Sequence, residues 1–205
     1  MQFEGPELTA LLLATSFAAG LNVYATVATM GLLGRYDLLV LPGSLHIVSS
    51  WWVIGICAVM FAVEFFADKI PWFDLLWNAL HTFVRAPVAA MLAYGAASHL
   101  SPQMQLLSGI AGGAIALIAH GGKTAARAAV TASPEPVSNI ALSLGEDTLA
   151  IFLTWFAAQH PYWSATVAVV GIVLIILLMR VVVASLVKLF HDAGRQIKMG
   201  LSPQR

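Results

Sequence analysis

Long apolar stretches separate the few charged residues of this chain, and they set what it can fold into. A membrane-crossing helix needs roughly 20 apolar residues, because the hydrocarbon core of a bilayer is about 30 Å thick. The chain contains six stretches of about this length, at 8–34, 48–67, 71–97, 104–130, 136–158 and 163–188. They predict an all-α, polytopic membrane helix bundle with about six spans.

Composition supports a membrane protein and excludes several other classes. Charged residues make up 10% of the chain, whereas a soluble domain carries about 25%. Acidic and basic residues balance at ten each, so the chain has no basic field and we expect no nucleic-acid partner. A single cysteine, Cys57, rules out an internal disulfide framework. Standard catalytic and metal motifs are absent, so no catalytic residue, metal or cofactor is predicted.

Two of the six spans, 71–97 and 136–158, begin at a proline and contain charged residues. Each is therefore either a full crossing or a short re-entrant segment. Pro71 precedes Asp74 by three residues, as Pro136 precedes Asn139, and this shared layout suggests an internal repeat of the kind found in transporters. We expect residues 1–190 to form one transmembrane domain and residues 191–205 a short polar cytoplasmic tail.

The basic residues predict an orientation. With six spans, seven Lys and Arg residues lie on the side that holds both termini, and Arg35 alone lies on the other side. Because cytoplasmic loops are enriched in Lys and Arg, both termini are predicted to be cytoplasmic. Gly109 and Gly113 form a small-xxx-small face of the kind that packs helices closely. Together with a compact bundle, such faces predict a homo-oligomer.

A first group of polar residues lies deep inside the predicted spans. The helix rise places Arg85 about 21 Å into its span, and Glu146 and Asp147 about 15–17 Å into theirs. Charged residues at this depth usually pair or line water. Arg85 could thus neutralise one or both carboxylates in a solvated site. Alternatively, a buried ion pair between them could do no more than fix the register of the helices. Gly145 is expected to loosen its helix. The predicted substrate- or ion-binding residues are Asn22, His81, Arg85, Glu146 and Asp147.

A second polar group lies at the predicted cytoplasmic edge. The helix starts at Pro71 and Pro136 offer free N–H groups among basic side chains, an arrangement that suits an anion. The alternative is ordinary helix caps with acids that pair with topology-setting lysines. The residues of this predicted vestibule are Glu64, Asp68, Lys69, Asp74, Lys123, Arg127, Ser133, Glu135 and Asn139.

Four stretches give the chain a resemblance to a known family. They are 20–26 (GLNVYAT), 67–74 (ADKIPWFD), 81–87 (HTFVRAP) and 133–139 (SPEPVSN). They resemble the family catalogued as domain of unknown function 4126, over roughly residues 15–155. Its members are small multi-pass membrane proteins, mainly bacterial, so the resemblance implies a helical bundle in the bacterial inner membrane. It implies no reaction.

The polar groups lead to three hypotheses of function. The first is a small transporter or channel-like carrier for a small ion or an anionic solute, with a charged midplane site and a basic cytoplasmic vestibule. The second is a membrane-embedded enzyme that acts on a lipid or polyprenyl phosphate. The third is a non-catalytic subunit or assembly factor of a membrane complex. In each case the lipid bilayer is a partner, and a non-enzyme is favoured.

Overall fold

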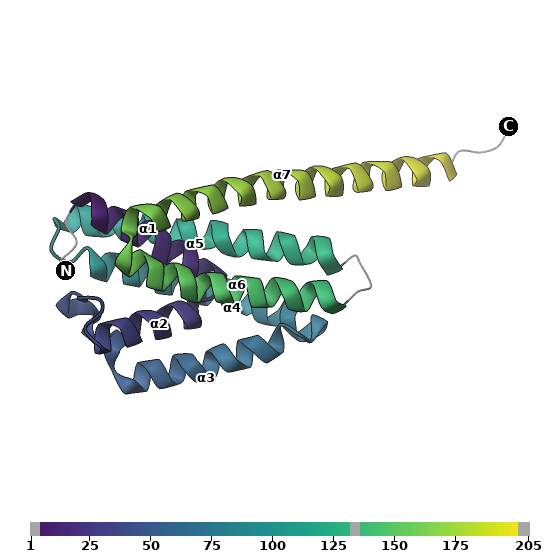
Figure 1. The fold of residues 1–205 in the computed structure, drawn as a ribbon. Coiled ribbons are helices and arrows are strands. Elements are labelled where there is room, and N and C mark those ends of the chain that lie inside the picture. The colour runs from purple at the N-terminus through teal and green to yellow at the C-terminus, as the bar shows by residue number, and fades with distance from the viewer. Residues whose placement is uncertain (1–4, 132–135, 201–205) are drawn as a thin grey trace.

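Every regular element of the described chain is a helix. The structure is a computed structural model that describes residues 5–131 and 136–200. In these residues there is no strand, which confirms the predicted all-α bundle (Figure 1). The elements in order are α1 (Gly5–Leu21), α2 (Val23–Arg35), the 3₁₀ helix η1 (Gly43–Ser49), α3 (Trp51–Ala67), α4 (Pro71–Ala96), α5 (Pro102–Thr131), α6 (Pro136–Gln159) and α7 (Pro161–Gly200).

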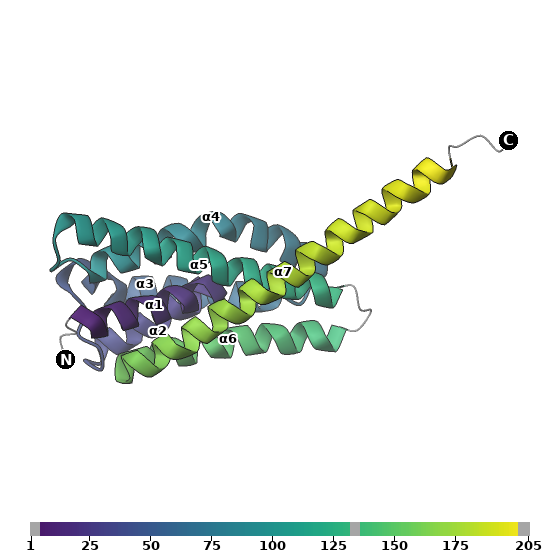
Figure 2. The same cartoon turned by 90° about the horizontal axis from the view of Figure 1, so that it is seen from above.

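The first apolar stretch, 8–34, forms two short helices that meet in the middle of the bundle (Figure 2). α1 runs into the bundle, and α2 returns to the end from which α1 came. Leu8 near the start of α1 and Met30 near the end of α2 accordingly line one cavity. Their lengths of 17 and 13 residues are below the roughly 20 that a crossing needs. The prediction of one full span here is therefore wrong, because α1 and α2 form a re-entrant hairpin.

The turn of this hairpin depends on Asn22. Its backbone is extended, at φ −148° and ψ 105°, and its side-chain oxygen accepts a hydrogen bond from the Ala25 N–H at 3.0 Å. Such an N-cap satisfies one of the free donors at the start of a helix. A loosened helix was expected at Gly145, but α6 is continuous through that residue.

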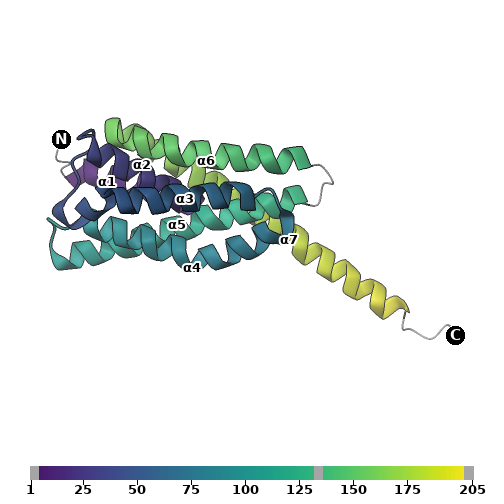
Figure 3. The ribbon, with the colours of Figure 1, turned by 90° about the horizontal axis from the view of Figure 1, so that it is seen from below.

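The remaining α-helices, α3 to α7, run along the bundle in alternating directions (Figure 3). The hairpin enters and leaves at one end, and five lengthwise helices follow it. The start of α1 and the C-terminal end of α7 therefore lie at opposite ends of the bundle (Figure 1). This corrects the prediction that both ends of the chain share one side, which counted the hairpin as a crossing.

Apolar helices long enough to cross a membrane are fewer than the predicted six. Among the described residues, three helical segments have the necessary length and composition, and the bent pair of η1 and α3, with 58° between its parts, makes a fourth. α4 is 26 residues long, but polar residues such as Asn78 and Arg85 lower its apolarity. The three segments are Pro102–Arg127, Ile140–Gln159 and Pro161–Ser185. These helices define a membrane protein.

α7 is the longest helix and extends well beyond the rest of the bundle (Figure 2). Its 40 residues correspond to about 60 Å at 1.5 Å per residue. The segment predicted as a polar tail, 191–205, thus begins inside this helix, which continues to Gly200. Residues 201–205 lie outside the described residues.

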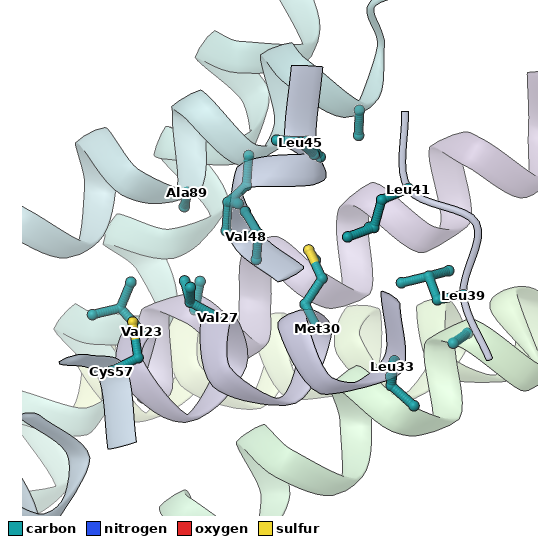
Figure 4. Close-up of a cluster of buried hydrophobic side chains, with 14 of the residues drawn as sticks. Val23, Val27, Met30, Leu33, Leu39, Leu41, Leu45, Val48, Cys57 and Ala89 are labelled. Atoms are coloured by element: carbon teal, nitrogen blue, oxygen red, sulfur yellow. The ribbon is translucent and has the colours of Figure 1, made fainter. Parts of the chain in front are cut away.

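A hydrophobic cluster fixes the hairpin at the end where it enters (Figure 4). Val27 and Met30 of α2 pack with Leu45 and Val48 of η1 and with Ala89 of α4, all of them buried. Bringing these side chains out of contact with water or lipid headgroups favours the folded arrangement. The cluster joins the outer part of the hairpin to α4.

Glycines allow the inner part of the hairpin and the α4–α5 pair to pack closely. A Cβ added at Gly20 would lie 2.4 Å from the Ala116 carbonyl oxygen of α5. A Cβ at Gly109 or Gly113 would lie 3.3 Å from carbonyl oxygens of α4. These small faces are therefore used inside one chain, and the homo-oligomer stays a prediction.

The close approach at Gly20 leads to a first prediction. Gly20→Ala should destabilise the protein by about 1–3 kcal/mol, because the new methyl group would overlap backbone that cannot move aside easily. Gly145→Ala is the matched control, since a Cβ there meets nothing within 4 Å. It should leave stability unchanged or raise it by up to about 1 kcal/mol through helix propensity. Unfolding in increasing denaturing detergent measures both, and equal midpoints for the two variants would contradict the prediction.

Candidate functional site

Seven charged side chains from four helices meet beside the turn of the hairpin. None of them is more than 8% exposed. We call them the charge network: Glu64 and Asp68 of α3, Arg85 of α4, Lys123 and Arg127 of α5, and Glu146 and Asp147 of α6.

Arg85 pairs with Glu64, and not with the carboxylates predicted for it. Its guanidinium forms a buried salt bridge with Glu64, and its NH1 donates to the His120 ring at 2.7 Å. The sequence placed Glu64 at the membrane edge because it lies near the end of its apolar stretch. In the structure α3 ends inside the bundle, where even Asp68 is fully buried. Glu64 therefore reaches the depth of Arg85.

Lys123 and Arg127 connect the two predicted polar groups into one network. The Lys123 ammonium lies 3.2 Å from Glu64, 3.5 Å from Asp68 and 3.4 Å from Glu146. Arg127 lies 2.6 Å from Asp68 and 3.0 Å from Glu146. These two cations are buried and neutralised by acids, so they do not form the open basic surface expected at a cytoplasmic vestibule.

The hairpin turn supplies two helix ends to this network. Arg85 NH1 and Lys123 Nζ each donate, at 3.4 Å, to the backbone carbonyls of Gly20 and Leu21 at the end of α1. The C-terminal end of a helix carries partial negative charge, which cations stabilise. Asp147 lies at the start of α2, where the partial charge is positive. Backbone that leaves a helix at membrane depth needs such partners.

Asp147 is bound differently from the other acids. Its Oδ1 accepts a hydrogen bond from Asn22 Nδ2 at 2.8 Å, so Asn22 caps α2 and contacts α6 with one side chain. Its Oδ2 is buried and has no hydrogen-bond partner within the described part of the chain. In the same residues Asp147 forms no salt bridge, so the network holds four carboxylates against three cations.

His120 is a neutral link between Arg85 and α4. A guanidinium can only donate, so His120 Nδ1 accepts from Arg85 and the ring proton lies on Nε2. Nε2 then donates to Thr82 Oγ1 at 2.8 Å, and this hydroxyl donates to the Asn78 carbonyl at 3.1 Å. A second proton on His120 would have to bind Nδ1, and Nδ1 already accepts the hydrogen bond from Arg85.

His81 was predicted to lie with Arg85, yet its hydrogen bonds go elsewhere. Its Nδ1 lies 2.7 Å from the Trp77 carbonyl, to which it can only donate. Nε2 therefore accepts from the Tyr24 hydroxyl at 2.8 Å. His81 thus joins α4 to α2 and fastens the hairpin beside the network.

Sequence reasoning missed several residues in and beside the network. His120 and Ser143 bond directly to its charged side chains, whereas Thr82 bonds to His120 and Tyr24 to His81. Ser143 Oγ donates to Asp68 at 3.0 Å. A usable signal was present for two of them, because His120 precedes Lys123 and Ser143 precedes Glu146 by three residues. Residues with this spacing share one face of a helix.

The other predicted vestibule residues do not add to the described site. Lys69 Nζ donates to the Phe65 carbonyl at 2.7 Å and lies over the Phe65 ring. Its side chain therefore binds the last turn of α3 and does not join the network. Four predicted positions lie outside the described residues or have side chains that do: Asp74, Ser133, Glu135 and Asn139. Their part in an anion site stays a prediction.

The fold and the site define a class, a helical membrane protein with a re-entrant hairpin that turns against buried charges. Its family follows from a sequence profile: domain of unknown function 4126 (DUF4126) matches residues 9–181. The chain belongs to this family, as the four resembling stretches predicted. No curated protein and no solved structure gives a significant match.

Proposed function

We propose that the protein is a small transporter or channel-like carrier, and that the charge network at the hairpin turn is its transport site. The observation that carries this proposal is the hairpin turn itself. Two half-length helices end in the middle of the bundle, where their carbonyls and N-cap face buried charged side chains. Membrane transporters build substrate and ion sites from interrupted helices of this kind.

The composition of the network supports a transport site over a purely structural role in holding the hairpin. A buried charge in a membrane costs several kcal/mol, and intramembrane acids therefore tend to be functional. Hairpin docking alone needs cations for the end of α1 and one acceptor for Asn22. Four carboxylates against three cations exceed that need, and the surplus acid is available to bind cargo.

The distribution of basic residues outside the charge network supports an orientation in the bacterial inner membrane. Lys69, Lys188 and Arg195 lie toward the end at which α7 leaves the bundle, and Arg35 lies at the other end. By the positive-inside rule the C-terminal end of α7 is cytoplasmic. The hairpin then enters from the outer face, which places the start of α1 outside.

A cavity at this outer end offers a way toward the site. It has a volume of about 590 Å³ and lies between the hairpin and α4. Leu8 and Thr15 of α1, Met30 of α2 and Leu92 of α4 are among the residues that line it. Solute that enters here would meet the outer flank of the hairpin.

Flux through reconstituted protein tests the proposal. Proteoliposomes with a proton-sensitive dye and a panel of small cations and anions should show a flux that empty liposomes lack. Asp147→Asn should abolish that flux, because it removes the surplus carboxylate. Gly145→Ala, on the same helix but facing open space, should keep the wild-type rate. Equal rates for wild type and Asp147→Asn would mean that the network is only structural.

The predicted lipid-phosphate enzyme finds less support. Its headgroup site needed exposed cations, whereas Lys123 and Arg127 are 2% and 4% exposed. Both already bond to carboxylates. A phosphate would have to displace these acids from a buried position, at the cost of leaving them unpaired.

A further inference from the structure

We infer that the species bound at the surplus carboxylate is a proton, that it binds Asp147 Oδ2, and that Asn22 transmits its binding to the hairpin. This inference rests on the proposed function, since it names what the same site takes up. It stands on the geometry of three groups, namely Asp147, Asn22 and the start of α2.

The position of Oδ2 is the first support. Asp147 is 4% exposed, and this oxygen lacks a hydrogen-bond partner among the described residues. A buried carboxylate oxygen without a partner loses its hydration and gains nothing in return. A proton on Oδ2 removes the charge and leaves Oδ1 free to keep its bond with Asn22.

The surrounding charges are the second support. Lys123 of α5 and Glu64 and Asp68 of α3 lie near enough to act on Asp147 electrostatically. Glu146 precedes it on α6. Lys123 is already shared by Glu64, Asp68 and Glu146 at 3.2–3.5 Å, so it neutralises Asp147 only in part. Like-charged neighbours disfavour an ionised acid.

The chemistry of Asn22 favours a proton over a metal cation. Asn22 turns its NH₂ group toward Asp147, and its oxygen is held by the Ala25 N–H. A hard cation such as Ca²⁺ needs six to eight oxygens. The described residues contain no group of three or more His, Cys, Asp or Glu side chains that could hold a metal ion. One free carboxylate oxygen is enough for a proton.

Asn22 gives proton binding a structural consequence. A hydrogen bond to an ionised carboxylate is roughly twice as strong as one between neutral groups. The charge of Asp147 also stabilises the positive end of α2. Protonation therefore weakens both contacts that hold the hairpin tip against α6, and proton release restores them.

Infrared difference spectroscopy on the purified protein in lipid nanodiscs tests this inference without any transport assay. Wild type should show the carbonyl stretching band of a protonated carboxylic acid, which disappears as the pH is raised. The band should be lost completely in Asp147→Asn. It should remain in Glu146→Gln, because Glu146 is already paired with Lys123 and Arg127 and is not the proposed proton acceptor.

Each possible outcome supports or overturns the inference. A band that persists in Asp147→Asn, or its absence from wild type at every pH, overturns the inference. If Asp147→Asn fails to fold, ¹³C-labelled aspartate must shift the wild-type band, and a band that does not shift belongs to another residue type. A band assigned to Asp147 without any flux rejects the proposed function and keeps the proton site. Flux without the band keeps the proposed function and rejects the proton site.

Discussion

Arg85→Ala is expected to lower the free energy of unfolding by about 3–5 kcal/mol, the range for removing one partner of a buried ion pair. Arg85 and Glu64 are both fully buried, so among the described residues the variant leaves Glu64 with only the shared Lys123 ammonium. The carbonyl of Gly20 and the ring of His120 lose their donor as well. Unfolding of the purified protein in increasing denaturing detergent, followed by helical circular dichroism, measures the loss.

Two further variants separate charge from packing at this position. Arg180→Ala removes an exposed arginine of α7 and should change stability by no more than about 0.5 kcal/mol. The double variant Glu64→Gln/Arg85→Met removes both charges and should recover much of the loss, because no unpaired ion remains. If the double variant is as unstable as Arg85→Ala, the buried charge is not the cause.

Lys123→Met is expected to have the second large effect, a loss of at least about 3 kcal/mol. Methionine keeps most of the volume but removes the one cation that Glu64, Asp68 and Glu146 share. The network then holds four carboxylates against Arg85 and Arg127. Mutual repulsion of buried acids should open the bundle around the hairpin turn, and the same unfolding assay measures it.

A compensating change makes this prediction specific. Adding Glu146→Gln to Lys123→Met removes one of the acids that lost their partner, so the double variant should be more stable than Lys123→Met alone. Lys69→Met is the matched control, because Lys69 lies over the Phe65 ring outside the network. It should cost about 0.5 kcal/mol or less. Equal losses at Lys69 and Lys123 would contradict a role of the network in stability.

Much of the fold was predictable because its causes are local. The lengths of the apolar stretches gave the membrane class and the approximate ends of most helices. Pro71 and Pro136 begin α4 and α6 as expected, since proline lacks the N–H that is unpaired in the first turn of a helix anyway. The depth of Arg85, Glu146 and Asp147 also followed from helix rise, and all three are buried in the network.

The pairing within the site was not predictable in the same way. Arg85 had two predicted partners on α6, and its actual partner Glu64 lies on α3. The choice depends on how far α3 descends relative to α4, which is set by the turn between them and by side-chain packing. Sequence spacing gives depth along one helix, but it does not give the relative heights of two helices.

The sequence by itself determined that this chain is a helical membrane protein with more polar groups in its spans than topology requires. Only the tertiary structure decided that 8–34 turns back at Asn22. An asparagine inside an apolar stretch is compatible with a continuous helix. It becomes a turn because Asp147, 125 residues away, binds its side chain, and because Gly20 lets α1 lie against α5. Both contacts exist only once the helices have packed, so no local pattern encodes them.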